Sequence, residues 1–247
     1  MIVEIVVCTC RKCDSENIVK NGHDYKGAQK YHCRDCGSYG TLDKKVQYDE
    51  KTKRQAVDSY FERVSMRGVE RVFNVPRQRL AAWLVEEGDP LSEEDLSATL
   101  VQPQDDDVLE LDELWSFVLK KSKKRWIWIA LCRRTRQIVA YFSGNRKEAS
   151  CRKLWERIPP AYRKSQTYSD FWAAYQKVFP TETHQSVGKE SGQTNHVERW
   201  NNTLRQRLAR LVRKTLSFSK SDFFHKLMLK LFIYRYNRSR LAAISQT

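Results

Sequence analysis

Three acidic residues that lie far apart in the sequence could together carry out phosphoryl-transfer chemistry. Asp112 lies in the middle of a strand-like run, Asp170 ends a shorter run, and Glu198 lies near the start of a predicted helix. Hydrolysis and transfer of a phosphodiester use two divalent ions about 3.5–4 Å apart, and carboxylates hold them. Mg²⁺ prefers hard oxygen ligands and takes only a few carboxylates. The three acids therefore predict a catalytic site for two Mg²⁺ ions, which Mn²⁺ could replace.

Each of these acids also has another interpretation. Glu110 and Glu113 are alternatives to Asp112, because all three belong to the same run. Asp170 could cap the helix that follows it. Glu198 could stabilise the N-terminal end of its own helix through the helix dipole.

Five cysteines lie near the N-terminus, and four of them form two C-x-x-C pairs. These four are Cys10, Cys13, Cys33 and Cys36. Two such turns joined by a hairpin are typical of a four-thiolate zinc ribbon, which we expect over residues 1–47. So short and polar a segment cannot bury enough surface to fold unaided, so the Zn²⁺ would be structural. Cys8 is an alternative ligand to Cys10, and His23 and His32 are further alternatives.

The segment 48–88 predicts a helix-turn-helix DNA-binding domain. A first helix is expected up to Glu62, Ser65 is a suitable N-cap for a short helix over 66–73, and Pro76 suits the start of a third helix. In a helix-turn-helix motif the second of the two paired helices is the recognition helix, and its first residues read base edges in DNA. The corresponding residues are Arg77, Gln78 and Arg79. An ordinary helical bundle with solvated charges is the alternative.

Charge is distributed unevenly along the chain of 247 residues, which has a formal net charge of +15. Residues 86–113 contain many acidic and no basic side chains, whereas both flanking regions are basic. Within that stretch, residues 89–107 are rich in turn formers and predict an acidic linker. Such an excess of Lys and Arg favours a polyanion partner, most simply double-stranded DNA. No apolar run reaches the roughly 20 residues of a membrane span, so no membrane partner is expected.

The order of elements predicted over residues 108–247 is typical of a ribonuclease H-like α/β domain. Three antiparallel strands come first, followed by a helix, a strand, a helix, a strand and a helix, and basic C-terminal helices end the segment. This order brings an acid in the first strand, an acid after the fourth strand and an acid on a later helix to one edge of the sheet. The predicted fold class is thus multidomain α+β.

Several basic, amide and aromatic side chains near the acids are candidates for contacts with DNA. One face of the helix that carries Glu198, and the basic pair that follows it, could track phosphates. Trp172 could stack on an unpaired base, although such a residue is more often part of the core. The candidates are Trp172, Arg199, Asn202, Arg205, Arg213 and Lys214.

The run over residues 198–221 is similar to the C-terminal signature of IS1-family insertion-sequence transposases. Residues 112–115, 123–126 and 168–172 resemble that family too, as does the order of zinc ribbon, helix-turn-helix and catalytic domain. The resemblance implies that Asp112, Asp170 and Glu198 are a DDE triad. It also implies that the front half of the chain binds terminal inverted repeats.

Residues and resemblance together predict a DDE transposase that cleaves DNA and transfers strands with Mg²⁺. Its partners would be the terminal inverted repeats and the target DNA, and synapsis of two ends would need a homodimer or a higher oligomer. We expect it in the bacterial or archaeal cytoplasm, at the nucleoid. The alternatives are a non-catalytic zinc-ribbon and helix-turn-helix regulator, and a nuclease that cuts without joining ends.

Overall fold

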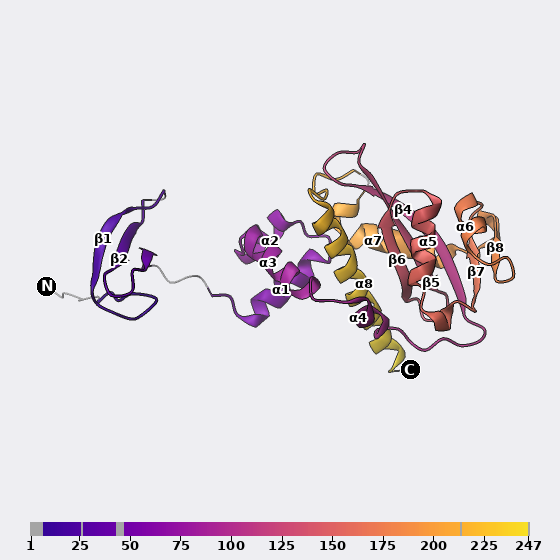
Figure 1. Ribbon diagram of the computed structural model, residues 1–247, viewed down its shortest axis with the longest axis horizontal. Coiled ribbons are helices and arrows are strands. Elements are labelled where there is room, and N and C mark those ends of the chain that lie inside the picture. Colours follow the sequence, from indigo (N-terminus) through magenta and orange to yellow (C-terminus); the bar gives the residue numbers. More distant parts are fainter. Residues whose placement is uncertain (1–6, 26, 43–46, 213, 247) are drawn as a thin grey trace. The chain divides into compact units, whose positions relative to one another are not determined.

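The computed structural model describes residues 7–25, 27–42, 47–212 and 214–246 (Figure 1). The chain divides into two compact units, Met1–Asp49 and Glu50–Thr247. Together they contain both helices and β-sheets, which confirms the predicted mixed α+β class. In the part of the chain that the structure describes, no helix is long and apolar enough to span a membrane.

The first unit contains a small antiparallel sheet. Its strands are β1 (Ile18–His23), β2 (Gln29–Cys33) and β3 (Tyr39–Thr41), and β2 lies between the other two. The pairing of Ile18 with Cys33 brings the beginning of β1 to the end of β2. One C-x-x-C turn precedes β1 and the other follows β2, so this register brings the two turns to the same end of the sheet.

The second unit begins with three helices that pack on one another: α1 (Glu50–Tyr60), α2 (Met66–Phe73) and α3 (Arg77–Gly88). The Ser65 hydroxyl accepts a hydrogen bond from the backbone of the third residue of α2, which confirms the predicted N-cap. Asn74 ends α2 in the left-handed conformation at φ 53°, a conformation that Asn tolerates well. The sharp turn between α2 and α3 follows from this residue.

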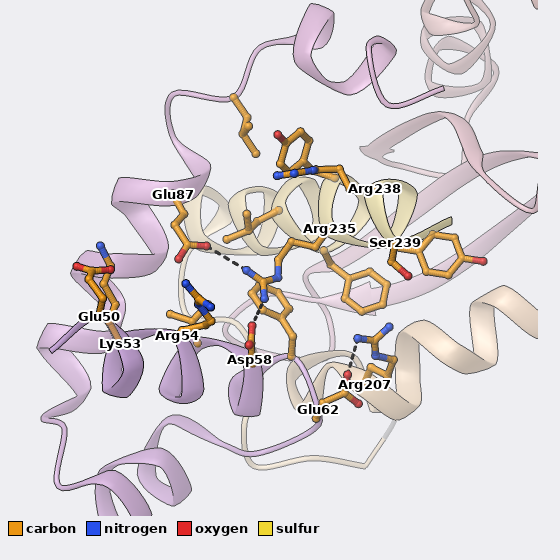
Figure 2. Close-up of a pocket in the computed structure, with 17 residues that line it drawn as sticks. Glu50, Lys53, Arg54, Asp58, Glu62, Glu87, Arg207, Arg235, Arg238 and Ser239 are labelled. Atoms are coloured by element: carbon orange, nitrogen blue, oxygen red, sulfur yellow. Dashed lines mark hydrogen bonds and ion pairs between the residues drawn. The ribbon is translucent and has the colours of Figure 1, made fainter. Parts of the chain in front are cut away.

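Ion pairs join α1 and α3 to the long C-terminal helix α8 (Asp222–Ile244). Figure 2 shows the Arg235 guanidinium of α8 pointing toward Asp58 of α1 and Glu87 of α3, and it pairs with both. The same guanidinium lies over the Phe61 ring at 5.1 Å from the ring centroid. The first three helices are therefore held against α8 within one compact unit.

The acidic segment 89–107, for which the composition predicts a linker, lies within the second unit. It contains a short helix, α4 (Glu93–Ser97), whose Leu96 is buried. The Asp107 carboxylate is buried too and forms an ion pair with Arg134 at 2.6 Å. The segment packs on the second unit because some of its acidic side chains meet basic partners that lie later in the sequence.

A five-stranded sheet occupies the centre of the second unit. Its strands are β4 (Val108–Phe117), β5 (Lys124–Cys132), β6 (Ile138–Gly144), β7 (Gln166–Ser169) and β8 (His184–Ser186). Their order is β6-β5-β4-β7-β8. The pairs β4–β5 and β5–β6 are antiparallel, whereas β4–β7 and β7–β8 are parallel. The structure thus contains the five strands that the sequence predicts, in the predicted order along the chain.

Helices cover both faces of this sheet (Figure 1). The helices α5 (Glu148–Arg157) and α6 (Ala173–Val178) bury their apolar residues against Leu109 and Leu111 of β4. The helix α7 (Asn195–Arg207) contacts β4 and β5, and its buried residues include the predicted apolar positions Val197, Trp200 and Leu204. Because side chains alternate along a strand, the residues next to Leu109 and Leu111 point toward α7.

Buried His225 of α8 makes the stability of the second unit depend on pH. Its Nδ1 lies 3.1 Å from Ser219 Oγ, and burial together with the charge of Arg210 lowers its pKa from 6.5 to about 4. The unfolded chain then binds a proton more readily than the folded chain, so His225 destabilises the fold as the pH falls through this interval.

We expect the unfolding free energy of the wild type, relative to His225→Gln, to decrease by about 3 kcal/mol between about pH 7 and about pH 4. Denaturant titration of both proteins at each pH measures this difference. Comparison with the variant cancels the other groups that titrate in the same interval. A difference that stays constant with pH would contradict the assignment.

Candidate active site and metal centre

The strand β4 carries three acids that face two different sides of the sheet. Glu110 and Asp112 point toward α7, where Asp112 Oδ2 accepts a hydrogen bond of 2.7 Å from Asn201 Nδ2. Glu113 points to the opposite face, where its Oε2 accepts a hydrogen bond of 2.9 Å from Tyr175 of α6. The alternation of the strand thus gives the three competing acids different surroundings.

The parallel pairing of β4 and β7 brings Asp112 and Asp170 abreast. The register pairs Glu110 with Tyr168, and each acid lies two residues further along its own chain segment. Neighbouring strands lie about 4.8 Å apart, so the two carboxyl groups start from adjacent backbones. Asp170 Oδ1 also accepts a hydrogen bond of 3.0 Å from the Trp172 backbone, so the residue orders the turn into α6 as well.

Glu198 reaches the same place from the first turn of α7. Its Oε1 accepts a hydrogen bond of 3.3 Å from Thr194 Oγ1 just before the helix. Asp112, Asp170 and Glu198 all line one cleft of about 290 Å³. The fold therefore gathers the three acids that the sequence singles out around a single space.

Electrostatic repulsion makes this cleft favourable for a cation. Burial, together with the neighbouring charges of Glu113 and Asp170, raises the pKa of Asp112 to about 7. Asn201 also lines the cleft, and its buried Oδ1 has no hydrogen-bond partner among the residues that the structure describes. A divalent cation bound by these hard oxygen atoms would offset the repulsion between the carboxylates and would give Asn201 Oδ1 a partner. The donor set present in the cleft thus fits Mg²⁺ or Mn²⁺.

A stacked arginine closes one side of the cleft. The Arg146 guanidinium lies between Trp126 and Trp172, at 4.6 Å and 4.1 Å from their ring centroids. Its Nη2 contacts Glu113 Oε1 at 2.5 Å. Glu113 and Asp112 both line the cleft, but Glu113 is engaged by Arg146 and Tyr175, whereas Asp112 accepts a hydrogen bond from Asn201. One face of Trp172 is covered by Arg146, so base stacking there stays a prediction.

Glu110 holds the N-terminal end of α7, a role that the sequence does not indicate. This fully buried carboxylate accepts hydrogen bonds from the backbone N–H groups of His196 and Val197, at 2.8 Å and 3.1 Å. Arg133 Nε donates to it at 2.8 Å, and burial raises its pKa against the opposing effect of this partner. Glu110 thus fixes the N-terminal end of α7, and with it the position of Glu198.

Replacing Glu110 by alanine is expected to lower the unfolding free energy of the second unit by about 3 kcal/mol. The reason is that Arg133 would lose its buried carboxylate partner. Hydrogen exchange should also speed up selectively in the first turn of α7. Denaturant titration and amide exchange measure the two effects. The matched change at exposed Glu182 should cost less than about 0.5 kcal/mol, and equal costs at the two positions would contradict this role.

The predicted DNA-contacting residues of α7 and its neighbours separate into two groups. Asn202 and Arg205 line the cleft beside Glu198. Arg199 and Lys214 are exposed and do not line it. Arg213 lies outside the described residues.

The predicted base-reading residues lie in the first turn of α3. Arg77, Gln78 and Arg79 are all exposed. Arg77 forms an ion pair of 2.8 Å with Glu70 of α2. Gln78 and Arg79 therefore remain the side chains of this turn that are most open to a partner.

The first unit gathers its cysteines in two turns of the same design. In one turn Asp14 N donates to Cys10 O, and in the other Gly37 N donates to Cys33 O, at 2.8 Å and 3.0 Å. Asp14 and Gly37 both have positive φ angles, 56° and 67°, which reverse the chain after each cysteine pair. The hydrogen bond of 2.7 Å from Asn17 Nδ2 to Asp35 Oδ1 joins the two turns.

The four sulfur atoms of these turns face one another. All of the ligand atoms lie within 4.8 Å of one another, in the set Cys10, Cys13, Cys33 and Cys36. The backbone N–H of Lys12 donates to the Cys10 sulfur and lowers the pKa of this thiol to about 6, which favours the thiolate that binds metal. Exposed Cys8 lies outside the cluster. The geometry therefore favours Cys10 over Cys8, and the donor set fits a structural Zn²⁺.

The sequence of the second unit is similar to those of known proteins. Residues 108–238 match the family described as IS1 transposase. The chain is 37% identical over 129 residues to "Insertion element iso-IS1n protein InsB" of Shigella dysenteriae, covering 52% of this chain and 95% of that protein. It is 36% identical over 127 residues to "Insertion element IS1 4 protein InsB" of Escherichia coli (strain K12), covering 51% of this chain and 74% of that protein. The matched family segment contains the whole acidic cleft.

Proposed function

This chain belongs to the IS1 transposase family, and on that premise we propose that it binds the terminal inverted repeats of an insertion sequence and catalyses metal-dependent DNA cleavage and strand transfer. One observation carries the catalytic part of this proposal. Asp112 lies in β4, Asp170 directly follows β7 and Glu198 lies in α7, yet all three border the same cleft. Carboxylates arranged in this way suit a pair of divalent ions.

In this proposal the three carboxylates hold two Mg²⁺ ions, or Mn²⁺ in their place. When bound, the ions would activate the attacking oxygen and stabilise the leaving oxygen of an in-line displacement at phosphorus. Arg205 and Lys189 line the cleft as well and would bind the phosphates on either side of the scissile bond. Cleavage by water and attack by the freed 3′-hydroxyl are the same type of displacement, so one site serves both steps.

The order and direction of the strands support a ribonuclease H-like catalytic domain. The strand β4, which carries Asp112, lies at the centre of the sheet. On one side the pairs β4–β5 and β5–β6 are antiparallel, and on the other side the pairs β4–β7 and β7–β8 are parallel. The pair α2–α3 supports a helix-turn-helix, because its exposed start carries Arg77, Gln78 and Arg79. We assign recognition of the terminal repeats to this pair and to the zinc ribbon.

Two further features of the proposal follow from the reaction. Joining two element ends requires synapsis, so the active form on DNA is at least a homodimer. A protein that acts on its own element works where that DNA is, so we place it at the nucleoid. The zinc ion is structural and takes no part in the chemistry.

The experiment that tests the function uses purified protein, DNA with the terminal repeat, and Mg²⁺ or Mn²⁺. The wild type should nick the repeat end and join it to target DNA, whereas Asp170→Ala should still shift the repeat in a gel without cutting it. A wild type that only shifts the DNA would favour a non-catalytic regulator. A wild type that cuts without ever joining ends would favour a nuclease. Cleavage by Asp170→Ala at the wild-type rate would overturn the site.

A further inference from the structure

In a second cavity of the Glu50–Thr247 unit, the charged side chains among the described lining residues are all positive. It encloses about 510 Å³ between the pair α2–α3 and the segment 209–221 that precedes α8. No carboxylate occurs among the described residues that line it. Its cationic lining residues are Arg67, Arg71, Arg77, Arg210 and Lys220. A cavity with this lining attracts an anion.

Another cavity of the same unit has a lining in which acidic and basic side chains pair with each other (Figure 2). It encloses about 830 Å³ between α1 and α8, and both acidic and basic side chains line it. Figure 2 shows Arg235 directed at Glu87 and Arg207 directed at Glu62, and both pairs are ion pairs. Two of its arginines, Arg207 and Arg235, thus have acidic partners within the protein. In the basic cavity Arg77 pairs with Glu70 of α2, but the other lining cations have no carboxylate partner among the described residues, so an anion from outside would balance their charge.

Arg210 is the strongest indication of an anionic ligand. Its residue is only 9% exposed. Nε donates to the Tyr60 hydroxyl at 2.7 Å and Nη1 donates to Ser219 Oγ at 3.2 Å, so its bonded acceptors are neutral. Within the described residues it forms no ion pair with a carboxylate. A buried cation without a counter-charge is costly, and a phosphate at the cavity would supply that charge.

Exposed cations surround the opening of the cavity. Arg67 and Arg71 lie one turn apart on α2, and Lys220 lies opposite them on the segment before α8. None of the three has an ion-pair partner in the described part of the chain. Together with Arg210 they present positive charge from two separate elements, which suits a chain of phosphates better than a single small anion.

Apolar side chains form the other part of the lining. Phe218 and Phe224 line the cavity, and Leu216 is 97% exposed at its border. Aromatic side chains interleaved with cations are typical of surfaces that bind single-stranded nucleic acid, because unpaired bases stack on the rings. Duplex DNA keeps its bases inside and would leave this apolar surface without a partner.

A row of rings connects this cavity with the acidic cleft. The Phe218 ring lies 5.5 Å from that of Phe117, which lies 6.3 Å from that of Trp115. Trp115 lines the acidic cleft, and Phe218 lines the basic cavity. These ring contacts therefore link the linings of the two cavities along β4.

We propose that the basic cavity binds single-stranded DNA, with phosphates on Arg210, Arg67 and Lys220 and a base against Phe218. The choice of DNA as the polyanion rests on the proposed function. The site holds the strand end that is unpaired at the element tip while the adjoining phosphate occupies the acidic cleft. Binding at the cavity itself needs neither a divalent ion nor the three carboxylates.

The experiment measures fluorescence anisotropy of a labelled twelve-nucleotide oligo-dT and of a twelve-base-pair duplex in EDTA. The double variant Arg67→Ala/Lys220→Ala and the single variant Phe218→Ala are compared with Arg152→Ala/Lys153→Ala. The control also removes two exposed positive charges, from α5. Thermal unfolding of each variant verifies that it folds.

Both cavity variants should bind oligo-dT about tenfold more weakly than the control, as expected for the loss of a stacked base or of two phosphate contacts. Their affinity for the duplex should change much less. Oligo-dT with 5-iododeoxyuridine should crosslink to residues 216–224 of the wild type. Equal affinities of the cavity variants and the control, or an equal loss for duplex and oligo-dT, would overturn the proposal.

The same assay separates this proposal from the proposed function. Asp170→Ala should bind oligo-dT in EDTA as tightly as the wild type, because the carboxylates take no part in the cavity. If the wild type never cleaves DNA but the cavity variants lose oligo-dT binding, the transposase function fails and the cavity stands. If the wild type cleaves and joins ends but the cavity variants bind oligo-dT as tightly as the control, the transposase function stands and the cavity proposal fails.

Discussion

Asp112→Asn is expected to reduce metal-dependent cleavage of terminal-repeat DNA by about a thousandfold or more, and yet to raise the melting temperature of the protein in EDTA. The loss follows because a metal-held transition state is stabilised by several kcal/mol, which corresponds to a factor of this size. The gain follows because the carboxylate is buried beside Glu113 and Asp170, and its pKa is raised to about 7. Above that pH the uncharged amide avoids the repulsion.

Two comparisons make this prediction specific. Added Mg²⁺ should raise the melting temperature of the wild type and leave that of Asp112→Asn unchanged, since a ligand stabilises only the state that binds it. Asp105→Asn, an exposed acid of the segment 89–107, should behave as the wild type in both assays. A variant at position 112 that melts lower than the wild type in EDTA would contradict the electrostatic account of the cleft.

Removal of the bound metal is expected to unfold the Met1–Asp49 unit and to abolish binding of the terminal repeats. A structural zinc ion contributes about 10 kcal/mol or more to the folding of such a unit, and little else stabilises a sheet of three short strands. Elemental analysis should find one zinc ion per chain. Circular dichroism before and after chelation, together with a gel-shift assay, measures the structural and functional losses.

The cysteines supply a matched pair of variants for this prediction. Cys33→Ser removes a buried member of the four-sulfur cluster and should lose the zinc, whereas Cys8→Ser changes an exposed cysteine outside it and should keep the zinc. The unit Glu50–Thr247 should remain folded in both variants. One zinc ion per chain in Cys33→Ser would contradict the ligand set.

Local patterns predict most of the secondary structure. The helix over 66–73 has the predicted ends, because Ser65 caps its start. The acids of the cleft could be chosen from the sequence for a similar reason. Acidic residues are scarce after residue 113, so Asp170 and Glu198 stand out in their segments.

Features that depend on partners far away in the sequence could not be predicted in the same way. The charge of the segment 89–107 predicts an acidic linker, and it does not indicate that Asp107 is buried beside Arg134, which lies beyond this segment. Glu110 and Asp112 are two acids of the same strand, and the sequence does not distinguish their roles. The structural role of Glu110 becomes evident only from the hydrogen bond that it accepts from the backbone of α7. The basic cavity combines α2 with a segment more than a hundred residues later, so no local pattern could reveal it.

The central claim is that Asp112, Asp170 and Glu198 jointly hold a pair of divalent ions. Counting bound Mn²⁺ by electron paramagnetic resonance, with terminal-repeat DNA present, tests this claim most directly. The account predicts two ions per chain for the wild type and for Glu182→Gln. It predicts fewer for each of Asp112→Asn, Asp170→Asn and Glu198→Gln. Two ions per chain in any of these three variants would contradict it.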